Sequence, residues 1–297
     1  MEKIEALSLA KINFGLEVSG LQPDGYHELR TLFQTINLSD RLVFRLRIDD
    51  TIKLAGDLPA IGWDESNLIY RAALSLKQET GSKQGVEIEV KKIIPPGRGL
   101  AGGSSNAAVT LLVLNRLWDL NLPAGPLLKL GASIGADVPF FFYGGLCFGA
   151  GRGDRLEPLP GLLAGWLVLV IPDFTLSTSR VFKEYEASSP SLTSSGKESK
   201  IIQFLTRQDR SLFRQLKNDL ELVAFKIYPQ LAEIKEEMTQ SGAELSMMTG
   251  SGSAVYGFFG DKQQAEKAAD KFRARYKVIL AETVGREQYK ERLLTGA

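Results

Sequence analysis

The glycine-rich segment Pro95–Ser105 constrains the fold more than any other part of the chain, with four glycines among residues 97–103. Before it, Val86–Val90 alternates apolar and acidic residues, which predicts a strand with one apolar face. After it, the apolar stretch Ser104–Leu117 predicts a long helix. The N-terminus of a helix carries unpaired N–H groups and favours an anion, and glycines let that anion approach the backbone closely. A tight turn capped by Ser104 is the alternative, but such a turn needs fewer glycines.

Three familiar nucleotide-binding loops contain similar glycines, and the sequence context excludes each of them. A Rossmann loop follows the first strand and needs an acidic residue about 20 positions later at a strand end, whereas the nearest such acid, Asp119, ends the predicted helix. A Walker A loop needs Gly-Lys-Ser/Thr, and Gly103 stands in the place of the lysine. A protein-kinase loop needs His-Arg-Asp and Asp-Phe-Gly motifs, which the sequence lacks.

Composition excludes several other classes of protein. The chain has one cysteine, Cys147, and one histidine, His27, so neither an intrachain disulfide nor a zinc site of Cys and His ligands is expected. Lys and Arg number 36 against 35 acidic residues, without a basic stripe, so no nucleic-acid partner is expected. The longest apolar run, Gly161–Ile171, is too short to span a bilayer, and we expect a cytoplasmic protein without a membrane partner. Phosphoryl transfer remains open, because it depends on positioning and charge.

The other predicted elements mix hairpins with helices, which favours an α+β fold over a parallel doubly wound sheet. Further strands are expected at residues 8–18, 29–36, 42–46, 166–171, 243–248, 254–259 and 277–283. Further helices are expected at residues 67–78, 126–134, 211–225, 228–240 and 261–276. The serine-rich stretch 188–199 is expected to be a surface loop.

Several motifs resemble those of one kinase superfamily. Pro95–Ala108 resembles the phosphate-binding motif of the galactokinase, homoserine kinase, mevalonate kinase and phosphomevalonate kinase superfamily. Ala10–Asn13 and Asp24–Gln34 are similar to the N-terminal segments of its 4-diphosphocytidyl-2-C-methyl-D-erythritol kinases. Gly135–Phe140 and Thr249–Gly252 resemble two later motifs of those enzymes, in the same order, although a hairpin turn is the alternative for the second.

The resemblance implies a fold and an activity. It implies transfer of a phosphoryl group from ATP, with Mg²⁺, to the 2-hydroxyl of the cytidine diphosphate-linked polyol, a step of the non-mevalonate isoprenoid pathway. It implies an ATP-binding N-terminal domain at residues 1–160, like the second domain of ribosomal protein S5. A ferredoxin-like substrate-binding domain follows at residues 161–297, with the active site in the cleft between them, in a monomer or weak homodimer. The alternatives are another small-molecule kinase of the superfamily or a non-catalytic sensor of ATP and sugar.

Two charged residues are the catalytic candidates. The resemblance makes Asp137, beside the apolar run 138–143, the base that takes the proton from the substrate hydroxyl, whereas a turn aspartate is the alternative. It makes Lys11, inside an apolar strand, the group that orients Asp137 and offsets charge on the transferred phosphoryl group. The alternative is an edge-strand lysine. The presence of both residues argues against a non-catalytic sensor.

The resemblance also assigns binding residues. Asn13, on the same strand face as Lys11, is expected to bind the polyol. Tyr26 and His27 are expected to stack on and read the cytosine base, with Phe182 as the second aromatic ring and Thr178 beside it. An exposed turn histidine and a core phenylalanine are the alternatives for two of these.

The predicted nucleotide site is the whole glycine-rich segment. It consists of Pro95, Pro96, Gly97, Arg98, Gly99, Leu100, Ala101, Gly102, Gly103, Ser104 and Ser105, of which Ser105 is the candidate ligand for Mg²⁺. Arg98 and Ala101 depart from the commonest form of the motif. Arg98 either contacts a phosphate or lies in solvent, and Ala101 is harmless unless the backbone there needs a positive φ.

Overall fold

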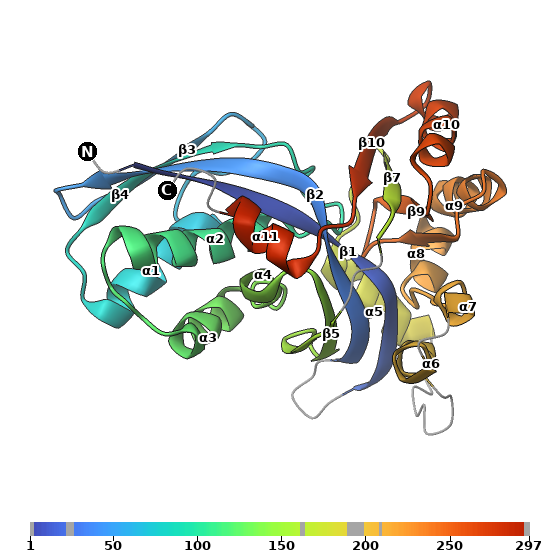
Figure 1. Cartoon of the computed structure of the whole chain (residues 1–297), viewed down its shortest axis with the longest axis horizontal. Coiled ribbons are helices and arrows are strands. Elements are labelled where there is room, and N and C mark those ends of the chain that lie inside the picture. Colours follow the sequence, from blue (N-terminus) through green and yellow to red (C-terminus); the bar gives the residue numbers. More distant parts are fainter. Residues whose placement is uncertain (1–2, 22–26, 161–163, 189–198, 208–209, 294–297) are drawn as a thin grey trace.

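The N-terminal half of the chain builds the first of two sheets, seen across the upper left and centre of Figure 1. The computed structural model describes residues 3–21, 27–160, 164–188, 199–207 and 210–293. The first sheet contains β1 (Lys3–Leu21), β2 (His27–Arg47), β3 (Ile52–Gly56), β4 (Gly85–Lys91), β5 (Leu146–Gly151) and β6 (Arg155–Pro158). Its order is β3-β4-β2-β5-β6, with β1 paired to β2, and among the strand pairs of the described residues only β3–β4 is parallel.

Strand β2 is continuous, so the prediction of two separate strands at 29–36 and 42–46 is wrong in this respect. Polar residues between the two apolar segments suggested a break. In the structure Ser39 and Asp40 stay paired with β1. The fully buried Asp40 carboxylate accepts hydrogen bonds from the backbone N–H groups of Ile93 (2.7 Å) and Ile94 (2.9 Å) and forms an ion pair with Lys92. Because its lone pairs are satisfied, this carboxylate is accommodated in the middle of a strand.

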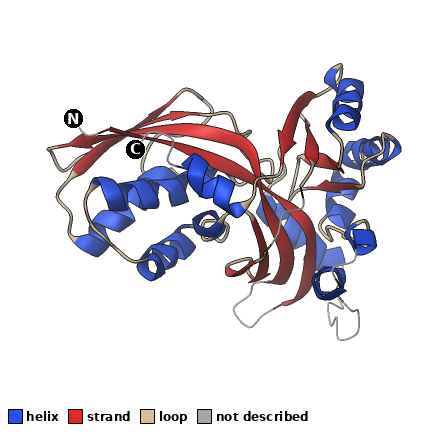
Figure 2. Cartoon of the chain, in the orientation of Figure 1, coloured by secondary structure: helices blue, strands red, loops and turns tan. Residues whose placement is uncertain are grey.

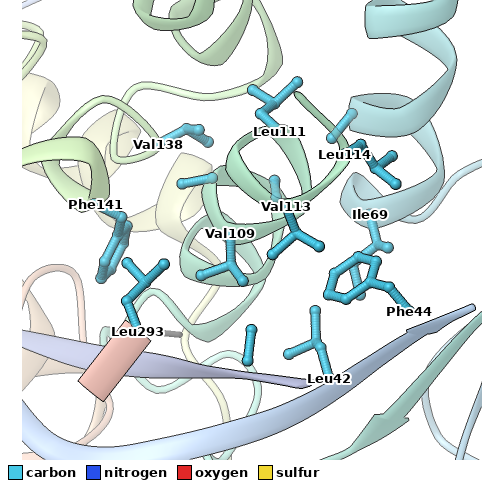
Figure 3. Close-up of a cluster of buried hydrophobic side chains, with 14 of the residues drawn as sticks. Leu42, Phe44, Ile69, Val109, Leu111, Val113, Leu114, Val138, Phe141 and Leu293 are labelled. Carbon is cyan, nitrogen blue, oxygen red and sulfur yellow. The ribbon is translucent and has the colours of Figure 1, made fainter. Parts of the chain in front are cut away.

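Four helices cover one face of this sheet: α1 (Leu68–Thr80), α2 (Gly102–Leu117), α3 (Ala124–Ile134) and α4 (Phe140–Tyr143) (Figure 2). Alternation along β2 points Leu42 and Phe44 toward the helices, where they meet Ile69 of α1 (Figure 3). Helix α2 is buried on nearly all sides from Ser105 onward, where alanine, valine and leucine predominate. Its N-terminus therefore has a fixed position beneath the sheet.

The second sheet has the predicted ferredoxin-like topology. It contains β7 (Trp166–Ile171), β8 (Leu245–Met248), β9 (Val255–Phe259) and β10 (Lys277–Glu282), in the antiparallel order β10-β7-β9-β8. Its helices are α5 (Thr178–Ser188), α6 (Lys200–Arg207), α7 (Arg210–Phe213), α8 (Glu221–Ile227), α9 (Gln230–Gln240) and α10 (Lys262–Arg273). The α5–α9 helices follow the first strand of this sheet and α10 follows the third, which gives a βαββαβ pattern. The predicted α+β class with two domains is thus confirmed.

The two sheets share a core. On β7, Val168 and Val170 pack with the helices of the second unit, whereas Leu167 and Leu169 face the first. There they join a cluster that includes the fully buried Phe14 of β1. A large apolar contact of this kind holds two domains in a fixed relation. The two sheets consequently meet at a rigid junction.

One predicted helix, at residues 211–225, is wrong. The structure has two short helices there, α7 and α8, separated by a non-helical segment. This segment leaves the helical path because it bonds to β1: Leu16 N donates to Lys217 O (2.8 Å), and Asp219 N donates to Leu16 O (2.8 Å). Tertiary hydrogen bonding has overridden local helix propensity.

The helix α11 (Arg286–Leu293) returns to the first domain. Figure 1 shows it in red beside α4, away from the second sheet. Its Tyr289 and Leu293 belong to the core of the first domain, and Figure 3 shows Leu293 next to Phe141. The chain thus passes from the first sheet to the second between Pro158 and Trp166, and this helix crosses back.

The remaining predicted elements either appear in the structure or lie outside the described residues. Strands at 86–90 and 166–171 and the helices near 67–78, 104–117, 126–134, 228–240 and 261–276 appear with small shifts at their ends. Strands β3, β5 and β6 and helices α4, α5, α6 and α11 were not anticipated. Most of the serine-rich stretch, residues 189–198, lies outside the described residues. None of the helices within the described ranges combines the length and apolar character needed to cross a membrane.

Candidate active site

A cavity of about 1300 Å³ opens between the two domains. Its walls bring together four segments that are far apart in the sequence: β1, the glycine-rich segment, the turn at Asp137, and the glycine turn between β8 and β9. Lys11, Asn13, Gly103, Asp137 and Gly250 all line it. The site is thus formed at the rigid junction of the two sheets.

Strand β1 supplies Lys11 and Asn13. Because side chains alternate along a strand, Ala10, Ile12 and Phe14 enter the shared core and these two polar residues face the cavity. Lys11 Nζ donates to Asn13 Oδ1 (2.7 Å), and Asn13 Nδ2 donates to Thr31 Oγ1 (2.8 Å). The amide of Asn13 is thereby held in one orientation.

The Lys11 ammonium is buried and has three polar neighbours. Its side chain is 3% exposed, and Nζ also donates to Gly99 O (3.0 Å) and lies 3.6 Å from the Asp137 carboxylate. Burial lowers the pKa of Lys11 below its ordinary 10.5, an effect that the charge of Asp137 partly offsets. The Asp137 side chain is 35% exposed, so its carboxylate is open to a bound molecule while it faces a fixed cation.

The glycine-rich segment turns sharply before α2. Gly97 and Gly99 have φ values of +67° and +75°, in the left-handed region that favours glycine. Ala101 also lies there, with φ 54°, so the condition under which this alanine is unfavourable is met. The first hydrogen bond of the helix joins Ser105 N to Ala101 O (2.9 Å), so the N–H groups of residues 102–104 precede the bonded part of α2. These groups form the end of the helix that favours an anion.

The glycine turn between β8 and β9 interlocks with this segment. Thr249 Oγ1 donates to Gly99 O (3.2 Å), and Asn13 N donates to Thr249 Oγ1 (3.3 Å). The backbones are so close that a methyl group on Gly99 would lie 2.0 Å from Thr249 O. Arg98, which differs from the commonest form of the motif, donates from Nη1 to Ser253 Oγ (3.0 Å) and so bonds to the second domain.

Ser105 does not line the cavity, as a ligand for nucleotide-bound Mg²⁺ would have to. Its fully buried hydroxyl donates to Leu9 O (2.7 Å) and accepts from Ser8 Oγ (2.7 Å), so it anchors α2 to β1. It is absent from the cavity wall, to which Ser104 contributes instead. Among the described residues there is also no group of three or more His, Cys, Asp or Glu side chains that could hold a metal ion. These residues do not fit a built Mg²⁺ site.

The predicted base-binding residues are only partly described. Thr178 and Phe182 line the cavity at the start of α5, and the Thr178 hydroxyl lies 2.7 Å from Ser251 Oγ. Phe182 also packs against the core of the second domain, so the two expectations for it are compatible. Tyr26 lies outside the described residues, and His27 is described only as the first residue of β2.

Three polar residues at this site were not among the predicted site residues, although two of them, Thr249 and Asn106, lie within the motifs named above. Thr249 contacts Asn13 across 236 positions, a pairing that no local pattern reveals. Lys92 and Asn106 line the cavity, and Asn106 Oδ1 is buried without a partner among the described residues. The signal for Asn106 was its position near the start of a helix that is otherwise largely buried, since a buried amide is unfavourable unless something binds it.

Comparisons with known proteins agree with this geometry. Residues 67–145 match the model of the GHMP kinases N terminal domain, and residues 201–278 match that of the GHMP kinases C terminal region. The chain is 39% identical over 275 residues to the 4-diphosphocytidyl-2-C-methyl-D-erythritol kinase of Syntrophomonas wolfei, covering 91% of this chain and 94% of the relative. It is 41% identical over 279 residues to the enzyme of that name from Moorella thermoacetica, covering 93% and 97%.

Solved structures give the same result. A crystal structure of 4-(cytidine 5'-diphospho)-2C-methyl-D-erythritol kinase superposes with a TM-score of 0.80 at 34% identity, covering 95% of this chain and all of the other. Homoserine kinase from Cytophaga hutchinsonii, at 18% identity and a TM-score of 0.75, shares the fold. From its two matched domains and its full-length relatives, the chain belongs to the 4-diphosphocytidyl-2-C-methyl-D-erythritol kinase family of the GHMP kinases.

Proposed function

We propose that this chain transfers the γ-phosphoryl group of ATP to the 2-hydroxyl of 4-diphosphocytidyl-2-C-methyl-D-erythritol, giving the 2-phosphate and ADP in the non-mevalonate isoprenoid pathway. As a GHMP kinase it is an ATP-dependent phosphotransferase. The observation that carries the proposal is the 3.6 Å pair of Lys11 and Asp137, set in one cavity with Asn13 and the N-terminus of α2. Family membership supports the choice of substrate.

In this mechanism Asp137 is the general base. Its carboxylate is accessible, and we assign it the proton of the attacking hydroxyl. As the oxygen attacks the γ-phosphorus, the bond to the bridging oxygen of ADP breaks and negative charge moves to ADP. The buried Lys11 ammonium holds the carboxylate in place and stabilises charge on the transferred group, an effect that is strong where water is excluded.

The glycine-rich segment is the proposed phosphate site. The free N–H groups at the start of α2 and the helix dipole would hold the triphosphate, with Gly103 letting its oxygens approach. Mg²⁺ would come with the nucleotide, whose phosphates supply the oxygen ligands that this ion prefers. We assign the ion no protein ligand, since Ser105 is already occupied by β1.

The polyol and the base are assigned to other residues of the same cavity wall. Asn13 would bind the polyol through its amide, and Phe182 would stack on the cytosine, with Thr178 beside it. Tyr26 and His27 remain proposed base contacts. Because stacking tolerates any base, selection of cytosine requires hydrogen bonds as well.

An ADP-release assay with three acceptors tests the substrate. Turnover is expected with the cytidyl polyol, and no more than background turnover is expected with homoserine or mevalonate. Turnover confined to the latter two acceptors would refute the proposal.

Substitution of the proposed base tests the mechanism. Asp137→Asn keeps the size of the side chain but cannot accept the proton, so kcat is expected to fall roughly 10²–10⁴-fold. ATP binding, measured by calorimetry, should change little because the phosphate site lies on α2. A kcat close to that of the unmodified protein would remove Asp137 as the base.

A further inference from the structure

Asn218, between α7 and α8, is a buried amide that the mechanism above does not use. It is 2% exposed, and each part of its amide is bonded to backbone. Nδ2 donates to Met248 O (2.7 Å) and to Gly250 O (2.8 Å), while Oδ1 accepts from Leu220 N (3.0 Å). Both N–H groups of Nδ2 thus donate to the end of β8 and the turn that follows it.

The segment that carries Asn218 is itself fixed to β1. Besides the two backbone bonds at Leu16, Val18 N donates to Asp219 Oδ2 (2.9 Å). Strand β1 is the element that bears Lys11 and Asn13. Asn218 therefore connects this strand to the glycine turn. Its side chain lies outside the cavity wall, so it makes this connection without lining the cavity.

The turn held by Asn218 lies beside the proposed catalytic lysine. A methyl group on Gly250 would lie 3.4 Å from Lys11 Nζ and 3.5 Å from Asn13 Oδ1. The neighbouring Thr249 Oγ1 donates to Gly99 O, which also accepts the hydrogen bond of Lys11. A shift of this turn would therefore change the surroundings of the ammonium directly.

We propose that Asn218 is a positioning residue for phosphoryl transfer: its two hydrogen bonds set the distance between the glycine turn and β1, and hence the orientation of Lys11 toward Asp137. The inference rests on the proposed function, since it assigns Lys11 a part in the transfer step. Nucleotide affinity is expected to depend on it little, because the N-terminus of α2 is anchored separately through Ser105.

Three variants separate positioning from simple support. Asn218→Ala removes all three bonds, and Asn218→Asp keeps an acceptor for Leu220 N but removes both donors. The matched control is Asn115→Ala, since Asn115 also bonds backbone through both ends of its amide, to Leu122 O (3.1 Å) and Leu122 N (2.9 Å), away from the cavity. All three should lower Tm, because each leaves backbone groups without a partner.

Kinetics give the discriminating result. Displacement by about 1 Å can cost about 10²-fold, so kcat of Asn218→Ala and Asn218→Asp is expected to fall roughly 10–100-fold, with KM for ATP nearly unchanged. Asn115→Ala should keep kcat. Retained kcat in Asn218→Asp would show that only the bond to Leu220 matters and would overturn the proposal, as would retained kcat in Asn218→Ala.

Two precautions keep the outcome readable. If Asn218→Ala does not fold, Asn218→Ser, whose hydroxyl can donate one bond, replaces it, and a kcat equal to that of the unmodified protein then counts against the proposal. The unmodified protein is assayed first with the cytidyl polyol. Failure at that step refutes the proposed function, whereas the positioning role is judged only on ratios of variant to unmodified protein.

Discussion

The close approach of Gly99 to Thr249 predicts that a single methyl group at residue 99 will disturb the contact between the two domains beside the active site. In Gly99→Ala the new Cβ would lie 2.0 Å from Thr249 O and 2.9 Å from its carbonyl carbon. Because these atoms are backbone, no rotamer change relieves the overlap. The residue must also adopt φ +75°, which is unfavourable for alanine.

Gly97→Ala is the control that isolates the overlap. Its φ is +67°, but its Cβ would meet only the side chain of Thr175, with Cγ2 at 3.2 Å and Cβ at 3.8 Å, and this side chain can give way. Both variants carry a left-handed penalty of about 1–2 kcal/mol, partly offset by about 0.4–1 kcal/mol from the stiffer unfolded chain. Only Gly99→Ala adds overpacking, about 1–3 kcal/mol. The difference between the two variants is therefore about 1–3 kcal/mol.

Thermal unfolding and steady-state kinetics test this prediction. At about 2–4 °C per kcal/mol, Tm of Gly99→Ala should lie roughly 2–12 °C below that of Gly97→Ala. Its kcat should fall at least about 10-fold, since Gly99 O accepts from both Lys11 and Thr249 and a small misplacement is costly. Equal Tm values for the two variants would refute the interlock of the domains at this position.

Three further predictions follow from single residues. Burial lowers the pKa of Lys11, so kcat should begin to fall at a pH below 10.5, where the folded protein loses this proton. The unfolded chain keeps the proton up to about pH 10.5, so the contribution of Lys11 to the free energy of unfolding should rise with pH between its folded pKa and 10.5. A fall in kcat that persists in Lys11→Arg would contradict the first part. Ala101→Gly removes the backbone strain of φ 54° but increases the conformational freedom of the unfolded chain, and the two effects oppose each other. Tm should therefore change by less than a few degrees, with kcat retained. A large loss of Tm would disprove the strain. In Gly103→Ala the Cβ meets only Leu68 Cδ1, at 3.5 Å, so the substitution should leave Tm nearly unchanged while KM for ATP rises; an unchanged KM would argue against phosphate binding there.

Local patterns predicted the regular elements well where packing and propensity agree. The alternation of Val86–Val90 and the apolar run Trp166–Ile171 gave β4 and β7 almost residue for residue. The glycine-rich segment and the helix after it were also predicted, because glycine composition reports backbone conformation directly. The charged helix α11 was missed, since only Tyr289 and Leu293 of its eight residues are buried and no apolar stripe marks it.

The failures occur where distant hydrogen bonds decide the backbone. Residues 217–219 were expected to be helical, but they pair with β1 and place Asn218 behind the glycine turn. The contact of Asn13 with Thr249 likewise depends on how the two sheets meet. Lys11 and Asp137 were paired only through the resemblance, and their separation and the burial of the lysine are properties of the assembled cavity. Departures from local rules are expected at such sites.

The return of α11 to the first domain has a consequence for biosynthesis. The ring of Tyr289 packs against Gly144, and its hydroxyl donates to Phe141 O at the centre of the first core. Domains usually fold in the order in which the ribosome releases them. Here the N-terminal domain lacks part of its interior until residue 293 has emerged, by which time the second domain is already complete. We therefore expect the nascent first domain to remain incompletely packed during translation, and both domains to reach their native state together.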